Sequence, residues 1–317
     1  MIANGIDFGR VLCSSGARGF YGEGYWHHKI VDWSGSTFVA KTVTLEAKAG
    51  NMLLDGDLRP RERVPRCIVV KPLKGVVLNS VGLSNPGIEV VMGRWKDKTV
   101  AATLSPWMAS VMAVSKTKDE RVVETAKIFA FLKGQQNDHR ARMAQMGLQV
   151  NLSCPNAGVH APDLVEEARE VLDLSEVIGG TPVFCKVSAT MLPADAAKIA
   201  NHERCVGIVS SNTIPWGQMP ERVDWEGLFG SGASPLAHLG GGGLSGKPLL
   251  PIVRDWVYAF RNFSKKLVIA GGGVLSPEDA DALFDAGADA VELGSVSILR
   301  PWRVKKIIER INERRGP

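Results

Sequence analysis

The amino-acid sequence predicts an α/β protein built as a single (β/α)8 barrel, the TIM-barrel fold. Short apolar runs rich in β-branched residues alternate with longer segments of helical periodicity, which favours a parallel sheet covered by helices. Eight such runs occur, and eight is the strand number of a TIM barrel. The 317 residues exceed the roughly 250 of a typical barrel. We therefore expect one domain over residues 1–317, with insertions at the C-terminal face of the barrel.

The eight predicted strands follow one another without an internal repeat or a low-complexity linker. They cover residues 10–15, 37–42, 110–115, 148–153, 182–188, 206–211, 267–270 and 290–294. Amphipathic segments between them predict the main helices, at residues 119–132, 163–178, 194–202, 249–263 and 277–286. Residues 50–104 and 214–243 are longer than a single connection needs, so the insertions are expected there.

The net charge of +5 comes from the end of the chain. Residues 300–317 contain seven basic and two acidic residues, which accounts for the whole excess. Val304, Ile307, Ile308 and Ile311 have the spacing of an amphipathic helix, so the basic residues are expected on its solvated face. A nucleic-acid-binding protein normally has a broader basic surface, and nucleic acid is therefore not an expected partner.

The cysteines and the N-terminal residues indicate the compartment. The chain begins without the basic and apolar regions of a signal peptide, and no apolar run reaches the roughly 20 residues that span a bilayer. The five cysteines form no CxxC pair, which disfavours disulfides, an iron–sulfur cluster or a zinc site in this chain. We expect a cytoplasmic protein with no bound metal and no membrane insertion.

The residues that follow the strands are the strongest functional signal. In a TIM barrel the active site lies where the strands end and the next loops begin. Those positions hold polar amides, two lysines, one cysteine and several glycines: Ser15, Gly16, Lys41, Thr42, residues 151–156, Lys186, residues 211–213, residues 271–273, Gly294 and Ser295. They are expected to converge on one site.

Glycines after the last two predicted strands indicate a phosphate site. The segments read IAGGGVLSPEDA and VELGSVS. Glycine lets backbone N–H groups approach an anion closely, and Ser276 with Pro277 predicts a helix start just beyond. The loops after strands seven and eight commonly bind phosphate in this fold. The phosphate belongs either to a substrate or to FMN.

Lys186 ends an apolar strand, VFCKVS, and a buried lysine needs an anionic or strongly accepting partner. Two chemistries fit: a Schiff base with a carbonyl substrate, or a place beside N1/O2 of a flavin, where negative charge develops on reduction. Asn79, Asn151, Asn156 and Asn212 lie at strand or loop ends. Their amides offer both donors and acceptors, which suits the edge of a pyrimidine ring.

The motifs around these residues resemble, in the same order, those of the soluble class 1 dihydroorotate dehydrogenases. The resembling segments are AKTVT at 40–44, LNSVGLSNPG at 78–87, NLSCPN at 151–156, CKVS at 185–188, SNT at 211–213, GGLSGKPL at 242–249, AGGGV and ELGS. They extend from about residue 10 to residue 302. The resemblance implies a (β/α)8 barrel with tightly bound FMN that oxidises dihydroorotate to orotate in pyrimidine synthesis.

By this resemblance, Cys154 is the catalytic base that takes a proton from C5 of the substrate while C6 gives a hydride to FMN. A free thiol is only a few per cent ionised near pH 7, so this base needs a lowered pKa or a proton relay. The implied substrate-binding residues are Lys41, at the carboxylate, with backbone amides of Val81, Gly82 and Leu83, and, at the ring, Asn79, Asn151, Asn156, Asn212 and Thr213. The implied FMN-binding residues are Ser15, Lys41, Thr42, Asn151, Lys186, Ser245, Gly246, Gly272, Gly273, Gly294 and Ser295.

Two segments depart from the family pattern. Relatives often have an asparagine against the flavin at the end of the third strand, where this chain reads VMAVSK at 111–116. No flavin contact is therefore assigned to that strand. The basic segment RPRER at 59–63 is unusual and is expected to be a solvated loop.

Two other functions stay open. The first is a related flavin enzyme that oxidises dihydropyrimidines of the uracil or thymine type, which the IPWGQ segment at 214–218 resembles. Asn156 in SCPN and the cationic Lys41 favour orotate instead. The second is a flavin-free phosphate-binding barrel, either a lyase that uses Lys186 or a binding protein.

The electron acceptor stays open as well. Fumarate-linked members of the resembling family are homodimers, and NAD-linked members pair with an iron–sulfur flavoprotein subunit. Quinone-linked members typically use a serine base, whereas this chain has Cys154. The segments VGLSNPGIE and GGLSG are closer to the NAD-linked branch. We therefore expect a homodimer, which an iron–sulfur flavoprotein subunit would join if the electron acceptor is NAD.

Overall fold

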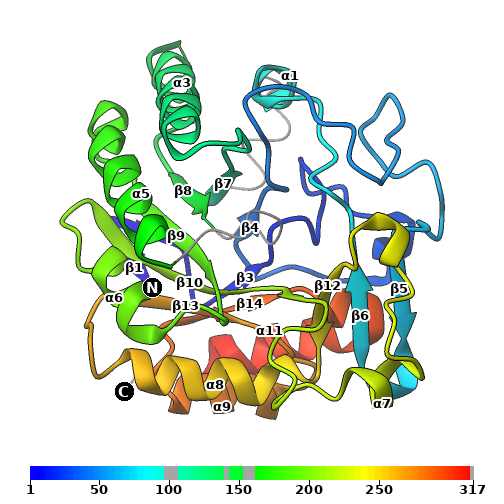
Figure 1. The fold of residues 1–317 in the computed structure, drawn as a ribbon. Helices are drawn as coiled ribbons and strands as arrows, with labels where there is room; N and C mark the ends of the chain where they lie inside the picture. The colour runs from blue at the N-terminus through cyan, green and yellow to red at the C-terminus, as the bar shows by residue number, and fades with distance from the viewer. Residues whose placement is uncertain (96–105, 139–142, 153–160, 315–317) are drawn as a thin grey trace.

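Eight short parallel strands form the centre of the molecule (Figure 1). The computed structural model describes residues 1–95, 106–138, 143–152 and 161–314. Most residues of these strands are buried, as expected where a sheet is covered on both faces. The strands are β3 (Val11–Cys13), β4 (Phe38–Val39), β7 (Trp107–Val111), β8 (Met146–Asn151), β9 (Val183–Ser188), β10 (Cys205–Asn212), β13 (Leu267–Gly271) and β14 (Ala290–Leu293).

The eight strands close into a barrel. Their order is β3-β14-β13-β10-β9-β8-β7-β4, so β3 and β4 are the two ends of the sheet. A parallel bridge between Leu12 and Thr37 joins those ends. Cys13 N donates to Thr37 O at 2.9 Å, and Thr37 N donates to Val11 O at 2.9 Å. The predicted (β/α)8 barrel is confirmed.

The third barrel strand lies earlier in the chain than the sequence predicts. It covers Trp107–Val111 rather than residues 110–115. The predicted end leaves the sheet because Glu124 Oε2 accepts hydrogen bonds from Val114 N at 2.8 Å and Ser115 N at 2.9 Å. Glu124 belongs to the next helix, α3 (Lys118–Asp138), and draws the chain toward it. The wholly buried Trp107 and Met108 fill the start of the strand instead.

Helices cover the outside of the barrel (Figure 1). Besides α3, the main ones are α5 (Ala161–Leu174), α6 (Pro193–Ala200), α8 (Leu249–Phe260), α9 (Pro277–Asp285) and α11 (Val304–Glu313). Short helices are α1 (Ile88–Trp95), α7 (Trp225–Phe229) and α10 (Val296–Leu299), and short 3-10 helices are η1 (Trp26–Ile30), η2 (Pro72–Lys74), η3 (Ser175–Ile178), η4 (Ala237–Leu239) and η5 (Pro301–Arg303). Within the described residues, no helix has the length and apolar character that crossing a membrane requires.

The last helix, α11, packs as the sequence predicts. Its apolar stripe of Val304, Ile307, Ile308 and Ile311 is buried. The basic face is solvated as expected, with the Arg310 side chain 58% exposed. Arg310 and Arg314 also form ion pairs with Asp281 of α9, at 2.9 and 2.8 Å. These contacts bind α11 to its neighbour through charge as well as apolar packing.

The two insertions meet in a second sheet, which the sequence analysis did not predict. This sheet is antiparallel, in the order β11-β12-β6-β5. Its strands are β5 (Ile68–Lys71), β6 (Val76–Asn79), β11 (Ile214–Pro215) and β12 (Gly243–Gly246). The pairing of β12 with β6 sets Gly243 opposite Asn79 and Ser245 opposite Val77. Segments about 165 residues apart thereby form one wall.

A hairpin at the N-terminus closes the opposite end of the barrel. Strands β1 (Ile2–Ala3) and β2 (Ile6–Asp7) pair antiparallel. The wholly buried Phe8 follows them and meets Phe184 edge-on, with ring centroids 6.3 Å apart. A Cβ at Gly147 would lie 2.8 Å from Phe8 Cζ, so β8 needs a glycine there. With this end filled, the strand ends on the other side are left for the site.

Candidate active site

A cavity of about 1920 Å³ opens at the carboxyl ends of the barrel strands. Its wall combines strand ends with both insertions and is polar where the barrel strands finish. The sequence-predicted residues that line it are Ser15, Lys41, Thr42, Asn79, Val81, Gly82, Leu83, Asn151, Lys186, Asn212, Thr213, Ser245, Gly272, Gly273, Gly294 and Ser295. The strand-end pattern predicts that these residues converge on one site, and the structure brings them together around this cavity.

Cys154, the predicted base, and Asn156 lie outside the described residues. Gly246 is described, but it packs within the second sheet: a Cβ there would lie 2.2 Å from Gly75 O. Its φ of 105° is one that side chains rarely adopt. Gly246 therefore supports the cavity wall through its packing in the second sheet.

Lys41 is buried at the cavity wall. Its Nζ donates to Ser84 O at 2.7 Å and lies 5.1 Å from the centre of the Phe20 ring. Burial lowers the pKa of Lys41 from 10.5 to about 8, because an apolar environment penalises the ammonium. A carbonyl and an aromatic face satisfy a cation only in part. An anion entering the cavity is thus the partner that would stabilise this residue most.

Lys186 has a carboxylate partner of its own. Its Nζ donates to Glu292 Oε2 at 3.0 Å, and both residues are buried. Glu292 also accepts from Ser14 Oγ at 3.1 Å and from Gln149 Nε2 at 2.8 Å. Glu292 was not predicted from the sequence. The available signal was an acidic residue inside the apolar strand VELG, since a buried charge requires a partner.

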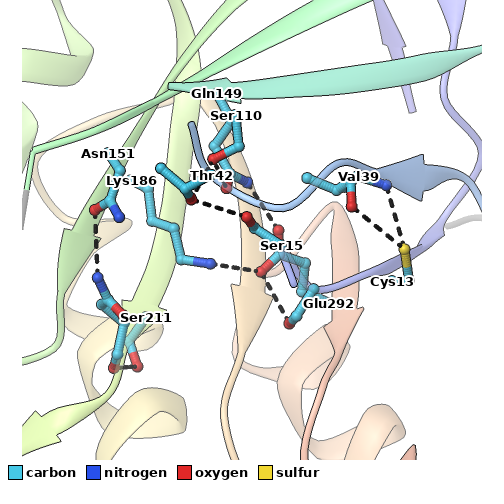
Figure 2. Close-up of polar contacts among 12 residues, drawn as sticks. Cys13, Ser15, Val39, Thr42, Ser110, Gln149, Asn151, Lys186, Ser211 and Glu292 are labelled. Carbon is cyan, nitrogen blue, oxygen red and sulfur yellow. Dashed lines mark hydrogen bonds and ion pairs between the residues drawn. The ribbon is translucent and has the colours of Figure 1, made fainter. Parts of the chain in front are cut away.

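A hydrogen-bonded row of side chains continues from Glu292 around the barrel interior, as Figure 2 shows. Ser110 Oγ donates to Gln149 Oε1 at 3.4 Å, and Thr42 Oγ1 lies 2.8 Å from Ser110 Oγ. Ser15 Oγ lies 2.9 Å from Thr42 Oγ1 and donates to Ala40 O. We call this row the polar belt; it comprises Ser14, Ser15, Thr42, Ser110, Gln149, Lys186 and Glu292. It links strands from both ends of the chain.

The asparagines form a second polar group beside Lys186. Asn212 Nδ2 donates to Asn151 Oδ1 at 3.3 Å, and the two residues belong to strands that flank β9. Asn212 Oδ1 accepts from Thr213 N at 2.9 Å. Asn79 Nδ2 donates to Gly243 O at 3.4 Å across the second sheet. Amides on two walls of one cavity suit a flat ligand with donors and acceptors on its edge.

The glycine cluster after β13 is held tightly against its neighbours. A Cβ at Gly273 would lie 2.7 Å from both Gly246 O and Leu250 N, and one at Gly272 would lie 2.8 Å from Val253 Cγ2. These residues line the cavity next to Gly294 and Ser295, which follow β14. These cavity-lining residues lie at the last two strand ends, which is the usual phosphate position of this fold.

Two segments contribute more to the cavity wall than the sequence predicts. Residues 112–116, which carry no asparagine, line the cavity with apolar side chains and with Ser115 and Lys116. In the exposed basic loop, expected to be only solvated, Arg59 and Arg63 line the cavity as well. Trp26 Nε1 donates to Arg63 O at 2.7 Å and holds that loop at the cavity.

Fold and site together define a class: a (β/α)8-barrel enzyme whose cavity joins a glycine cradle to buried lysines and amides. The sequence profile of the family described as dihydroorotate dehydrogenase matches residues 4–314. The chain therefore belongs to the dihydroorotate dehydrogenase family, whose members are oxidoreductases acting on CH–CH bonds.

Individual relatives agree with the family assignment. The chain is 27% identical over 299 residues to the catalytic subunit of dihydroorotate dehydrogenase B (NAD(+)) of Anoxybacillus flavithermus, covering 92% of this chain and 83% of that protein. It is 29% identical over 290 residues to a protein of Pediococcus pentosaceus named for dihydroorotate dehydrogenase A (fumarate), covering 86% and 80%. The crystal structure of the Eimeria tenella DHODH with ferulenol shares the fold, with a TM-score of 0.67, 19% identity, and coverage of 98% of this chain and 82% of that one.

Proposed function

We propose that this protein oxidises dihydroorotate to orotate in pyrimidine synthesis, with FMN as its cofactor. The observation that carries the proposal is the buried ammonium of Lys41, with a pKa of about 8, on the same cavity as the Asn151–Asn212 pair. A pyrimidine that bears a carboxylate satisfies both groups at once. Dihydrouracil or dihydrothymine would leave Lys41 without an anion, so Lys41 favours the carboxylated substrate.

The residues present fit FMN. The cradle of Gly272, Gly273, Gly294 and Ser295 lines the cavity at the usual phosphate position of this fold, and Lys186 offers a cation where a reduced flavin is negative. When bound, FMN supplies the hydride acceptor. Enzymes of this family use FMN. The lyase alternative is disfavoured, because the Lys186 amine is occupied by Glu292 at 3.0 Å rather than directed at a carbonyl.

The chain's own residues divide the remaining tasks. Lys41 and the backbone of residues 81–83 hold the substrate carboxylate, and Asn79, Asn151, Asn212 and Thr213 hold the ring, together with Asn156. Cys154 takes the proton from C5 as general base. Cys154 and Asn156 are assigned by the family motif alone.

We further propose that the enzyme acts in the cytoplasm and assembles with a second subunit that passes electrons to NAD. Relatives such as the Anoxybacillus flavithermus protein are named as catalytic subunits of the NAD-linked B type, which supports a partner. A homodimer that reduces fumarate is the alternative, since the Pediococcus pentosaceus protein is named for fumarate. Anaerobic reoxidation of the reduced protein by fumarate, without any partner, would favour the homodimer.

One anaerobic experiment tests the substrate and the base. The purified protein is expected to carry FMN, and its flavin absorbance should bleach with dihydroorotate but not with dihydrouracil. Cys154→Ala should retain FMN and bind orotate but bleach about 100-fold or more slowly, the usual contribution of a general base. Cys205→Ala, a buried thiol at the start of β10, is the matched control. Bleaching by dihydrouracil alone would contradict the proposed substrate.

A further inference from the structure

Glu292 is a buried carboxylate that the proposed reaction does not use. It lies in β14, is 1% exposed, and receives hydrogen bonds from Lys186, Ser14 and Gln149. Its neighbours Val291 and Leu293 are wholly buried. An ionised carboxylate among such residues costs several kcal/mol unless it is paired. The polar belt therefore surrounds the charge with donors on both oxygens.

The backbone makes room for this carboxylate. Gly271 of β13 is paired with Glu292 in the parallel ladder, and a Cβ at Gly271 would lie 2.9 Å from Glu292 Cβ. A side chain on β13 would thus displace Glu292 from the barrel interior. Glu292 and Lys186 both line the cavity, so their ion pair lies at its wall, within reach of what the cavity holds.

A lysine beside a flavin would normally add a full positive charge at the site. Such a charge stabilises the reduced, negatively charged flavin and makes the flavin easier to reduce. In this chain the carboxylate at 3.0 Å offsets that charge, and the offset is strong because both groups are shielded from water. The hydrogen bond also fixes the direction of the Lys186 side chain, since the ammonium is anchored at one end (Figure 2).

We propose that Glu292 is a positioning residue for Lys186, which holds its ammonium at the flavin and lowers the reduction potential of bound FMN by neutralising that charge. This inference rests on the proposed function, because it places Lys186 beside the flavin. Ser14 and Gln149 keep the carboxylate in place through their hydrogen bonds to its two oxygens.

Glu292→Gln removes the charge and keeps the shape. The polar belt can accommodate the amide of this variant. The Gln149 side-chain amide can flip, and the hydroxyls of Ser110, Thr42 and Ser15 can then reverse their hydrogen bonds, because a hydroxyl both donates and accepts. FMN should remain bound, and its midpoint potential, measured by anaerobic dye titration, should rise. We expect the ratio of affinities for reduced and oxidised FMN to rise about tenfold, which is about 30 mV for a two-electron couple.

The matched control is Asp255→Asn, which removes one negative charge from exposed ion pairs with Arg222 and Arg254 on the outer surface. Its potential should equal that of the wild type, since solvent and salt screen surface charge. An unchanged potential in Glu292→Gln, with FMN bound, would overturn the inference, because a merely structural residue would not set the potential.

The potential of the double variant Lys186→Met with Glu292→Gln is a second measurement. It tests the inference even if the single variant does not fold. It removes both charges, so its potential should stay within about 30 mV of the wild type, a tenfold ratio. A larger fall would show that Lys186 acts without an offsetting charge and would overturn the inference. The dye titration needs no substrate. If the wild type binds FMN but is not bleached by dihydroorotate, the proposed function fails, and the role of Glu292 is judged separately by the potentials.

Discussion

At the scale of single residues, Lys41 constrains the chemistry of the cavity most. Its ammonium is buried against Phe20 and the Ser84 carbonyl, and burial lowers its pKa from 10.5 to about 8. Between these two values the unfolded chain binds more protons than the folded one, so this residue makes stability rise with pH in that window and lowers it below pH 8. The protein keeps a destabilising charge in the place where an anionic ligand would use it.

We therefore predict that orotate affinity falls at high pH. The ammonium binds the carboxylate, and in the ligand-free protein Lys41 loses its proton near pH 8. The dissociation constant for orotate should be flat below that pH and should rise about tenfold per pH unit above it. Titration of the flavin absorbance with orotate at several pH values measures this profile.

Lys41→Met separates Lys41 from other titrating groups. The variant should bind orotate more weakly at neutral pH and without the loss near pH 8, because no ammonium remains to deprotonate. If Lys41→Met kept the wild-type pH profile, another group would be responsible and the role given to Lys41 would be wrong.

The sequence made some of these residues predictable and hid others. Lys41, Lys186 and the asparagines stand out because polar groups follow apolar runs at strand ends. Glu292 also stands out, as an acidic residue in an apolar strand. Its structural role could not be predicted, because one of its hydrogen-bond partners, Gln149, is 143 residues away in the chain. Their contact follows from the register and curvature of the closed sheet, and periodicity along one strand does not specify these.

At the scale of elements, the small sheet made by the two insertions shapes the cavity. Strand β12 pairs with β6 and carries Ser245 at the cavity wall, while Gly246 at its end pairs with Val76. The family motif assigns Gly246 to FMN. Its φ of 105° and the 2.2 Å approach of a Cβ to Gly75 O give it a role in the sheet that needs no ligand.

Gly246→Ala should therefore destabilise the protein even without FMN. The strained backbone costs about 1–3 kcal/mol, which should lower the midpoint of urea unfolding of the FMN-free protein. Gly232→Ala is the control, because a Cβ there meets nothing within 4 Å. If Gly246→Ala were as stable as the wild type without FMN but bound FMN more weakly, the role of Gly246 would be ligand binding alone.

Prediction from sequence was good for strand number and poorer for the third strand and the insertions. The eight apolar runs are local signals, and so is the stripe of α11. The third strand ends early because Glu124, some ten residues ahead, takes the backbone N–H groups of Val114 and Ser115. The second sheet joins Val77 to Ser245. Neither is visible in local periodicity. The first depends on a side chain of the following helix, and the second depends on pairing between segments 168 residues apart in the chain.

At the scale of the whole molecule, the cavity is built from both ends of the chain. Ser15 and Thr42 follow the first two barrel strands, and Gly272 and Ser295 follow the last two. The polar belt connects these ends within the closed barrel, from Ser15 through to Glu292. A ligand that spans the cavity would thus contact the strands at which the sheet closes, and its binding should stabilise the barrel as a unit.

Thermal unfolding with different ligands tests whether the glycine cradle binds the FMN phosphate. FMN added to the FMN-free protein at about 100 times its dissociation constant should stabilise it by about 2.7 kcal/mol, through mass action. Riboflavin at the same concentration has the ring but no phosphate, so it can contact the polar belt but not the cradle at Gly272, Gly273 and Ser295, and it should raise the melting temperature far less. Inorganic phosphate should recover little, because it is not tethered to the ring and binds as a separate ligand. Equal stabilisation by riboflavin and FMN would mean that the glycine cluster serves the packing against Leu250 and Val253 alone, and the cradle would lose its assigned role.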